Sequence, residues 1–183
     1  MHNKIEACRI CGTQALEEIS DLGEQAFTGI FPRAQEDPIP SGPLLLLKCT
    51  DCGLVQLAHD FPPDLLYGQS YGYRSGLNQS MVRHLQEKVR RILSVVQLRP
   101  GDLVVDIGSN DSTLLQSYPA HGVDLVGIDP TGAKFRSYYP QHVTLIPELF
   151  SRDLLLKIYQ GRRARIITSI AMFYDLQGPT QFM

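Results

Sequence analysis

The sequence predicts an α/β protein in two parts, and three features support that prediction. Two Cys-x-x-Cys-Gly motifs lie within residues 1–66, a segment rich in Pro and Gly. An amphipathic stretch from Asn78 to Leu98 predicts a helix. Beyond it, short apolar runs alternate with helical stretches, as in a doubly wound parallel sheet. We therefore expect a small metal-binding lobe at 1–66 and the first half of such a sheet at 67–183.

All four cysteines of the chain belong to the two motifs, Cys8-x-x-Cys11 and Cys49-x-x-Cys52, each followed by glycine. A two-residue gap lets one tight turn present two thiolates to the same ion, and the glycine can adopt the positive φ that such a turn needs. Two turns of this kind complete a tetrahedral site. The ligand type favours zinc, and four thiolates also suit iron.

A pair of structural disulfides is the alternative interpretation of the same cysteines. Cys-x-x-Cys pairs make poor static crosslinks, and residues 1–16 show no secretory signal. A closed four-sulfur site has no open coordination position, so it would stabilise structure and perform no chemistry. A segment so rich in Pro and Gly can bury little apolar area, and a metal would compensate for that.

The remaining elements follow from short apolar runs. Leu44–Leu47 predicts a strand that leads into the second cysteine motif, and Pro100-Gly101 ends the predicted helix. The expected strands beyond it are Leu103–Ile107, Leu125–Ile128, Val143–Ile146 and Ile166–Ala171, and the expected helical stretches are Thr113–Tyr118, Ala133–Tyr139 and Arg152–Tyr159.

The first of these strands runs into a loop, Gly108–Ser112, that is typical of nucleotide-binding folds. A strand that ends in an acid, here Asp106, and then a Gly turn is the entry to such a pocket. Dinucleotide binders favour three glycines, which let the backbone approach a pyrophosphate. Asn110 and Ser112 stand where the other two glycines would be. The loop therefore favours a cofactor without phosphates.

The next predicted strand ends at Asp129, about 20 residues beyond the loop, where an acid can accept hydrogen bonds from ribose hydroxyls. The alternative is that Asp106 and Asp129 cap the helical stretches that follow them. Because both acids stand at strand ends with the expected spacing, we favour their role as cofactor ligands.

Six motifs occur in an order that matches a known family. They are Cys8-x-x-Cys11-Gly12, Leu22–Gln25, Cys49–Leu57, Tyr71–Ser75, Asp106–Asp111 and Ile128–Pro130. Together they resemble the zinc-binding, S-adenosylmethionine-dependent C-methyltransferases that act on nucleotide-linked deoxysugars. The resemblance covers the whole chain and implies a zinc-binding lobe followed by a Rossmann-like methyltransferase sheet.

The resemblance implies methyl transfer from S-adenosylmethionine to a sugar carbon next to a ketone, after a base removes the acidic proton from that carbon. It also implies a cofactor site, with Asp106 acting electrostatically. Its members would be Tyr71, Tyr73 and Ser75 at the amino-acid end, Gly108, Ser109, Asn110 and Asp111 along the cofactor, Asp129 at the ribose, and Leu149 and Phe150 beside the adenine.

The sequence departs from the family pattern at two positions. Ser112 replaces the usual glycine, which would alter the approach of the cofactor. Asp175 lies near a position where many relatives carry an active-site histidine, so it is a candidate catalytic residue, with a helix cap before Pro179 as the alternative. Tyr71 and Tyr73 could instead pack between the metal-binding lobe and the predicted helix.

About four strands are predicted, whereas a sheet of this class has about seven. We therefore expect an N-terminal portion that lacks turnover by itself, with the remainder of the chain or a partner chain supplying the rest. A net charge of −2 and a pI near 6.2 argue against nucleic acid or an anionic membrane as the main partner. The partner that the resemblance implies is a nucleotide sugar. Reduced thiolates without a targeting segment indicate the cytoplasm.

Two other classes of function stay open from the sequence. One is a zinc-ribbon interaction module joined to a non-catalytic α/β domain, which the paired Asp106 and Asp129 disfavour. The other is a nicotinamide-dependent sugar oxidoreductase, which the loss of two loop glycines disfavours.

Overall fold

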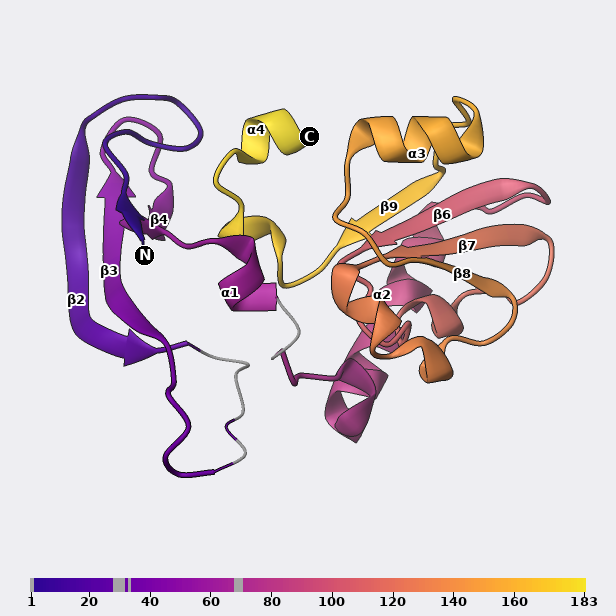
Figure 1. Ribbon diagram of the computed structural model, residues 1–183. Helices are drawn as coiled ribbons and strands as arrows, with labels where there is room; N and C mark the ends of the chain where they lie inside the picture. The colour runs from indigo at the N-terminus through magenta and orange to yellow at the C-terminus, as the bar shows by residue number, and fades with distance from the viewer. Residues whose placement is uncertain (1, 28–31, 33, 68–70) are drawn as a thin grey trace. The chain divides into compact units, whose positions relative to one another are not determined.

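The computed structural model describes residues 2–27, 32, 34–67 and 71–183 (Figure 1). Contacts between residues divide the chain into two compact units. The first consists of Met1–Gly72 together with Phe173–Met183, and the second is Tyr73–Met172. The sequence suggested a division after residue 66; the structure divides the chain six residues later and groups the C-terminal segment with the first unit.

The first unit consists mainly of antiparallel strands. Its larger sheet has the strand order β2-β3-β4, and β1 pairs with β5. The predicted strand at 44–47 is confirmed, because it lies within β3. The elements are β1 (Asn3–Lys4), β2 (Leu16–Ala26), β3 (Ser41–Cys49), β4 (Val55–Leu57), β5 (His59–Asp60), α1 (Pro63–Tyr67), the 3-10 turn η5 (Phe173–Asp175) and α4 (Pro179–Phe182).

The first unit contains a small apolar cluster. Leu45, Leu47 and Ala58 are its buried members, and Ile5 and Leu16 pack against it. Most side chains of the long strand β2 are exposed, and its pairing with β3 contains register shifts. The buried apolar side chains among the described residues of this unit supply little hydrophobic stabilisation, and a bound metal would add to it.

The second unit contains the predicted parallel sheet, which is confirmed with the strand order β8-β7-β6-β9 (Figure 1). From β6 the chain moves outward through β7 to β8, and it then returns to place β9 on the other side of β6. Ligands bind at the carboxyl ends of strands where the order reverses in this way. The elements are η1 (Ser75–Leu77), α2 (Gln79–Val95), β6 (Asp102–Ile107), η2 (Leu115–Ser117), β7 (Val123–Ile128), η3 (Pro130–Ala133), η4 (Arg136–Tyr138), β8 (Val143–Ile146), α3 (Arg152–Tyr159) and β9 (Ile166–Ser169).

Two of the predicted helical stretches are wrong. Residues 113–118 and 133–139 contain short 3-10 turns, not α-helices. The first stretch is only six residues long and is followed by Pro119, and the second connection is bounded by Pro130 and Pro140. Proline disfavours helical conformation at the residue before it, so neither stretch has room for a stable α-helix.

The predicted long helix is confirmed as α2. Its N-terminus is capped by Asn78, whose side-chain oxygen accepts a hydrogen bond from the Ser80 N–H at 2.9 Å. Leu85 and Val89 of α2 are buried in the main apolar cluster with Val104 of β6 and several neighbouring strand and turn residues. Among the described residues, no helix is long and apolar enough to cross a membrane.

We expect Leu85→Ala to lower the free energy of unfolding by about 2–5 kcal/mol, because it removes buried methyl groups and leaves a cavity between α2 and the sheet. Urea denaturation followed by circular dichroism measures the change. The matched control is Val95→Ala on the same helix, where the side chain is 83% exposed and the change should be within about 0.5 kcal/mol. Equal effects of the two substitutions would contradict this packing.

Candidate metal centre and cofactor site

The four cysteine sulfurs form one cluster, because their Sγ atoms all lie within 4.8 Å of one another. The shortest separations join the two motifs: Cys8 to Cys52 and Cys11 to Cys49, each at 3.6 Å. A tetrahedral zinc site with Zn–S bonds of about 2.3 Å has S–S edges of about 3.8 Å. The donor set therefore fits a single tetrahedral metal ion.

The two cysteine motifs have the same local structure. The glycine after each motif has a positive φ, 74° at Gly12 and 78° at Gly53, and its N–H donates to the carbonyl of the first cysteine of its motif at 2.9 Å. The Cys52 N–H also donates to the Cys49 sulfur at 3.4 Å. All four cysteines are free, and sulfurs at these separations are too far apart for a disulfide of about 2.05 Å. The disulfide alternative is therefore wrong for this structure.

The pKa values of the Cys8 and Cys11 thiols are shifted in opposite directions. Burial raises the pKa of the Cys8 thiol, but hydrogen bonds led by that from the Cys11 backbone outweigh burial and lower this pKa to about 6. At Cys11, a hydrogen bond from the Thr13 backbone lowers the pKa, but burial and the neighbouring thiols, led by Cys49, raise it to about 12. Several thiolates can coexist at such distances only when a cation offsets their mutual repulsion.

Arg9 is a residue of this centre that the sequence did not single out. It lies between two of the cysteines, and its guanidinium donates to the Leu57 carbonyl at 2.7 Å and pairs with Asp60 at 2.5 Å. Its backbone N–H donates to the Gln56 side chain at 3.2 Å. These contacts connect the first cysteine motif to β4 and β5. The sequence showed only a charged residue inside the first cysteine motif, and charged residues are common on solvent-exposed turns, so Arg9 did not stand out.

In the second unit, the Gly108–Ser112 loop lies at the carboxyl end of β6, the central strand beside the point where strand order reverses. Three of its residues have left-handed backbone conformations: φ is 74° at Gly108, 50° at Asn110 and 64° at Ser112. Non-glycine residues adopt this conformation at a cost of about 1–2 kcal/mol each, so other contacts must hold the loop.

Asn110 brings three of the predicted site segments together. Its backbone N–H donates to Asp129 Oδ2 at 2.7 Å. Its side-chain oxygen accepts from the Ser75 N–H at 2.9 Å, and its side-chain amide donates to the Tyr73 carbonyl at 3.1 Å. The structure therefore places Tyr73, Ser75, Asn110 and Asp129 at one site, although their roles toward a cofactor stay predictions.

Asp129 also caps the turn that follows it. Its Oδ1 accepts hydrogen bonds from both the backbone N–H and the hydroxyl of Thr131, each at 2.7 Å. The capping interpretation is thus confirmed for Asp129, in addition to its contact with the loop. A carboxylate can accept about four hydrogen bonds, so the three used here leave capacity for one more.

Asp106 does not cap a turn in the structure. It is buried on β6 and accepts a hydrogen bond from the Thr168 hydroxyl of β9 at 2.6 Å. Burial raises the pKa of its carboxyl to about 7; the Thr168 hydrogen bond opposes this rise, and the charge of Asp129 adds to it. Asp106 is therefore an unusually basic carboxylate directly before the loop.

Ser109 and Ser112 are held by residues from the turn after β7. The Ser109 hydroxyl shares a hydrogen bond with the Tyr139 hydroxyl at 2.8 Å, and Tyr139 also donates to the Asn110 carbonyl at 2.9 Å. The Ser112 hydroxyl donates to the Tyr138 carbonyl at 3.3 Å. Ser112 is thus accommodated as a fully buried hydrogen-bonding residue in a left-handed conformation. Tyr139 was missed, because the Tyr138-Tyr139 pair in a connecting segment matches no spacing that indicates a site.

The remaining predicted residues lie elsewhere. Leu149, 61% exposed, and Phe150 follow β8 at its carboxyl end. Tyr71 belongs to the first unit, where its ring packs on that of Tyr67 at 5.6 Å between centroids. Asp175, also in the first unit, accepts a hydrogen bond from the Tyr67 hydroxyl. The helix-cap alternative for Asp175 is wrong, because Gly178 occupies the cap position of α4.

Comparison with known proteins agrees with this geometry. Residues 8–67, which contain all four cysteines, match a family model described as "Putative zinc binding domain". Over 128 residues the chain is 30% identical to the C-methyltransferase NovU of Streptomyces niveus. Residues 8–67 therefore match a zinc-binding domain, and the chain is similar to part of a C-methyltransferase. The match covers 69% of this chain and 30% of the length of NovU. These two matches confirm the family resemblance that the motifs predicted.

We expect Cys49→Ser to abolish stoichiometric zinc binding, because three thiolates and a hydroxyl hold zinc far more weakly than four thiolates. Metal content of the purified chain, measured by atomic emission, and release of zinc on thiol modification give the readout. Thr50→Ser, next to the ligand but outside the cluster, is the control and should retain one metal per chain. A visible thiolate-to-iron absorption band would identify iron as the metal in place of zinc.

The raised pKa of Asp106 predicts a pH-dependent stability. A carboxyl whose pKa is higher in the folded than in the unfolded chain favours folding at low pH, and this contribution is lost as the pH rises from about 4 through about 7. Asp106→Asn should therefore change stability little at pH 4 and raise the free energy of unfolding at pH 8, on the order of 2–4 kcal/mol relative to wild type.

Urea denaturation at several pH values measures this difference. Asp124→Asn is the control, because Asp124 pairs with Arg162 on the exposed surface and should affect stability little at either pH. If the free energy of unfolding of Asp106→Asn depended on pH as it does in the wild type, the buried carboxyl would not titrate in this range.

Proposed function

We propose that the chain is the N-terminal part of an S-adenosylmethionine-dependent C-methyltransferase that methylates a carbon of a nucleotide-linked keto-deoxysugar in the cytoplasm. The observation that carries the proposal is the Gly108–Ser112 loop at the strand-order reversal, with Asp129 bound to its backbone, in a chain similar to a C-methyltransferase. S-adenosylmethionine, when bound, supplies an electrophilic methyl group.

The chemistry of the loop favours a cationic cofactor over a dinucleotide. Only Gly108 of the loop lacks a side chain, and the left-handed positions 110 and 112 carry Asn and Ser. A pyrophosphate needs close backbone approach, which these side chains obstruct. The carboxylate of Asp129 is bound to the loop backbone, so its charge repels phosphate and attracts a sulfonium or an ammonium group, and Asp106 directly before the loop adds to this when it is ionised.

Within this proposal the metal centre is structural. Four thiolates fill the coordination sphere, so no position is open for substrate or water. The metal would hold the first unit, whose apolar cluster is small, in the conformation that the full protein requires.

Asp175 stays a candidate base for the removal of the sugar proton. Burial raises the pKa of its carboxyl, while the hydrogen bond from Tyr67 opposes this rise. A carboxylate with a raised pKa is a better proton acceptor at neutral pH than an ordinary one. Because the match covers 30% of NovU, we expect other groups for the chemistry to lie in the rest of the protein.

The proposal predicts that S-adenosylhomocysteine stabilises the chain against heat. A ligand at 100 times its Kd stabilises the folded state by about 2.7 kcal/mol, enough to raise the Tm of the second unit by several degrees. Differential scanning fluorimetry measures the shift, and Asp129→Asn should reduce it because the variant weakens the contact with the loop.

Asp124→Asn is again the matched control, and NAD is the competing ligand. Stabilisation by NAD and not by S-adenosylhomocysteine would favour a nicotinamide-dependent oxidoreductase. Stabilisation by neither ligand would favour an interaction module without a cofactor.

A further inference from the structure

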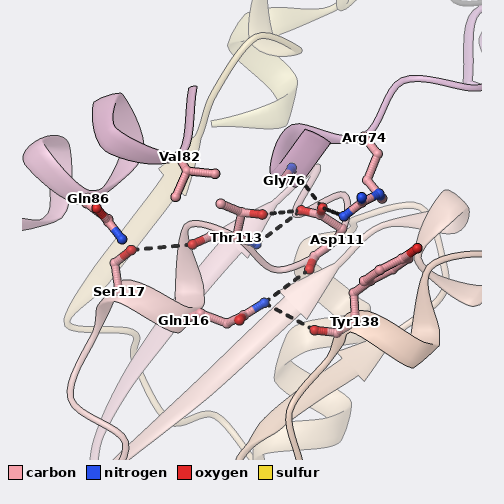
Figure 2. Close-up of a pocket in the computed structure, with 9 residues that line it drawn as sticks. All are labelled: Arg74, Gly76, Val82, Gln86, Asp111, Thr113, Gln116, Ser117 and Tyr138. Carbon is pink, nitrogen blue, oxygen red and sulfur yellow. Dashed lines mark hydrogen bonds and ion pairs between the residues drawn. The ribbon is translucent and has the colours of Figure 1, made fainter. Parts of the chain in front are cut away.

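A buried ion pair joins the segment before α2 to the Gly108–Ser112 loop. Arg74 Nη1 lies 3.0 Å from Asp111 Oδ2, and the two side chains are 18% and 1% exposed. Figure 2 shows this pair at the edge of a cavity of about 370 Å³ that α2 residues and the turn after the loop also line. Both residues belong to the second unit.

The carboxylate of Asp111 is saturated by hydrogen bonds from the described part of the chain. Its Oδ2 accepts from Arg74 and from the Gly76 N–H at 2.9 Å, and its Oδ1 accepts from the Thr113 hydroxyl at 2.5 Å and from the Thr113 N–H at 3.2 Å. A carboxylate offers about four acceptor positions, and four donors occupy them. Asp111 therefore has no acceptor capacity left for a ligand.

Arg74 is fixed from a second side. Its guanidinium lies over the ring of Tyr138, 4.1 Å from the centroid, a stacking arrangement that a planar cation favours. The carbonyl of Tyr138 accepts hydrogen bonds from the Ser112 hydroxyl and from the Gln116 side chain (Figure 2 draws the latter). The same residue thus contacts the ion pair and the end of the loop.

A side chain at Gly76 would crowd this pair. A Cβ atom added there would lie 2.7 Å from Asp111 Oδ2, closer than real contacts allow, and 3.0 Å from Arg74 Nη1, a tight contact, so the ion pair would have to shift. Because Gly76 does not have a positive φ, alanine would act at this position through crowding and not through backbone strain.

We propose that Arg74 and Asp111 are positioning residues that hold the loop in its cofactor-binding conformation, and that neither is a cofactor ligand. Asp111 stands between Asn110 and Ser112, the two residues of the loop that are left-handed and not glycine. When the side chain of Asp111 is held in place, the backbone on either side of it is held in the left-handed conformation, from which it would otherwise relax. The inference rests on the proposed function and assigns Asp111 a role different from the one the family resemblance suggests.

The test uses the full chain and S-adenosylhomocysteine as the probe. Isothermal titration calorimetry gives Kd, and hydrogen exchange followed by mass spectrometry reports on residues 108–113. We expect Arg74→Gln and Gly76→Ala to weaken binding by about 10–100-fold and to speed exchange in the loop, while exchange in β6 stays as in wild type. A general loss of stability would instead speed exchange in β6 as well.

Arg74→Lys keeps the charge but loses the planar stacking on Tyr138, so it should give an intermediate Kd. Arg74→Gln and Asp111→Asn should each weaken binding, and the double variant should lose less than the two losses combined because both break the same pair. Arg90→Gln is the control, since Arg90 makes an exposed pair with Glu87 on α2.

Wild-type affinity in Arg74→Gln would overturn the proposal. If that variant does not fold, Gly76→Ala carries the same test. If the wild-type chain does not bind the probe, the proposed function fails, and hydrogen exchange alone then decides: unchanged loop exchange in Arg74→Gln overturns the positioning role, and faster exchange supports it.

Discussion

The structure of the first unit depends on the approach of four sulfur atoms. Its apolar cluster is small and β2 is mostly exposed, so hydrophobic burial alone leaves this unit close to the limit of stability. The cysteine sulfurs join the segment after β1 to the end of β3, two regions far apart in the chain. A metal bound there would contribute folding free energy directly, since the unfolded chain has no preformed site.

In the second unit the sheet is well buried, and the segment that needs further contacts to hold its conformation is the Gly108–Ser112 loop. Asn110 and Ser112 adopt a conformation that glycine would adopt more readily. Contacts from Tyr73, Ser75, Asp129 and Tyr139 hold that conformation. Rigid positioning of this kind is useful for a binding site, because less conformational entropy is lost when a ligand binds.

Much of this arrangement follows from local sequence patterns. The cysteine spacing predicted the metal cluster, and the apolar runs predicted β6, β7, β8 and β9. A parallel strand that is buried on both faces has a nearly continuous apolar sequence, which is easy to recognise. The 3-10 turns after β6 and β7 were predicted as helical stretches because a β/α alternation places helices between its strands, yet nearby prolines limit their length. The contacts of Arg9, Arg74 and Tyr139 join residues distant in sequence, so no local pattern could reveal them.

Arg9 connects the metal centre to the neighbouring strands of the first unit. This residue lies between two ligands and reaches β4 and β5 through Leu57 and Asp60. Asp60 belongs to β5, which pairs with β1, so the salt bridge of Arg9 connects the first cysteine motif to this small sheet. A metal that fixes the motif would therefore also favour this strand pairing, which lies outside the coordination sphere.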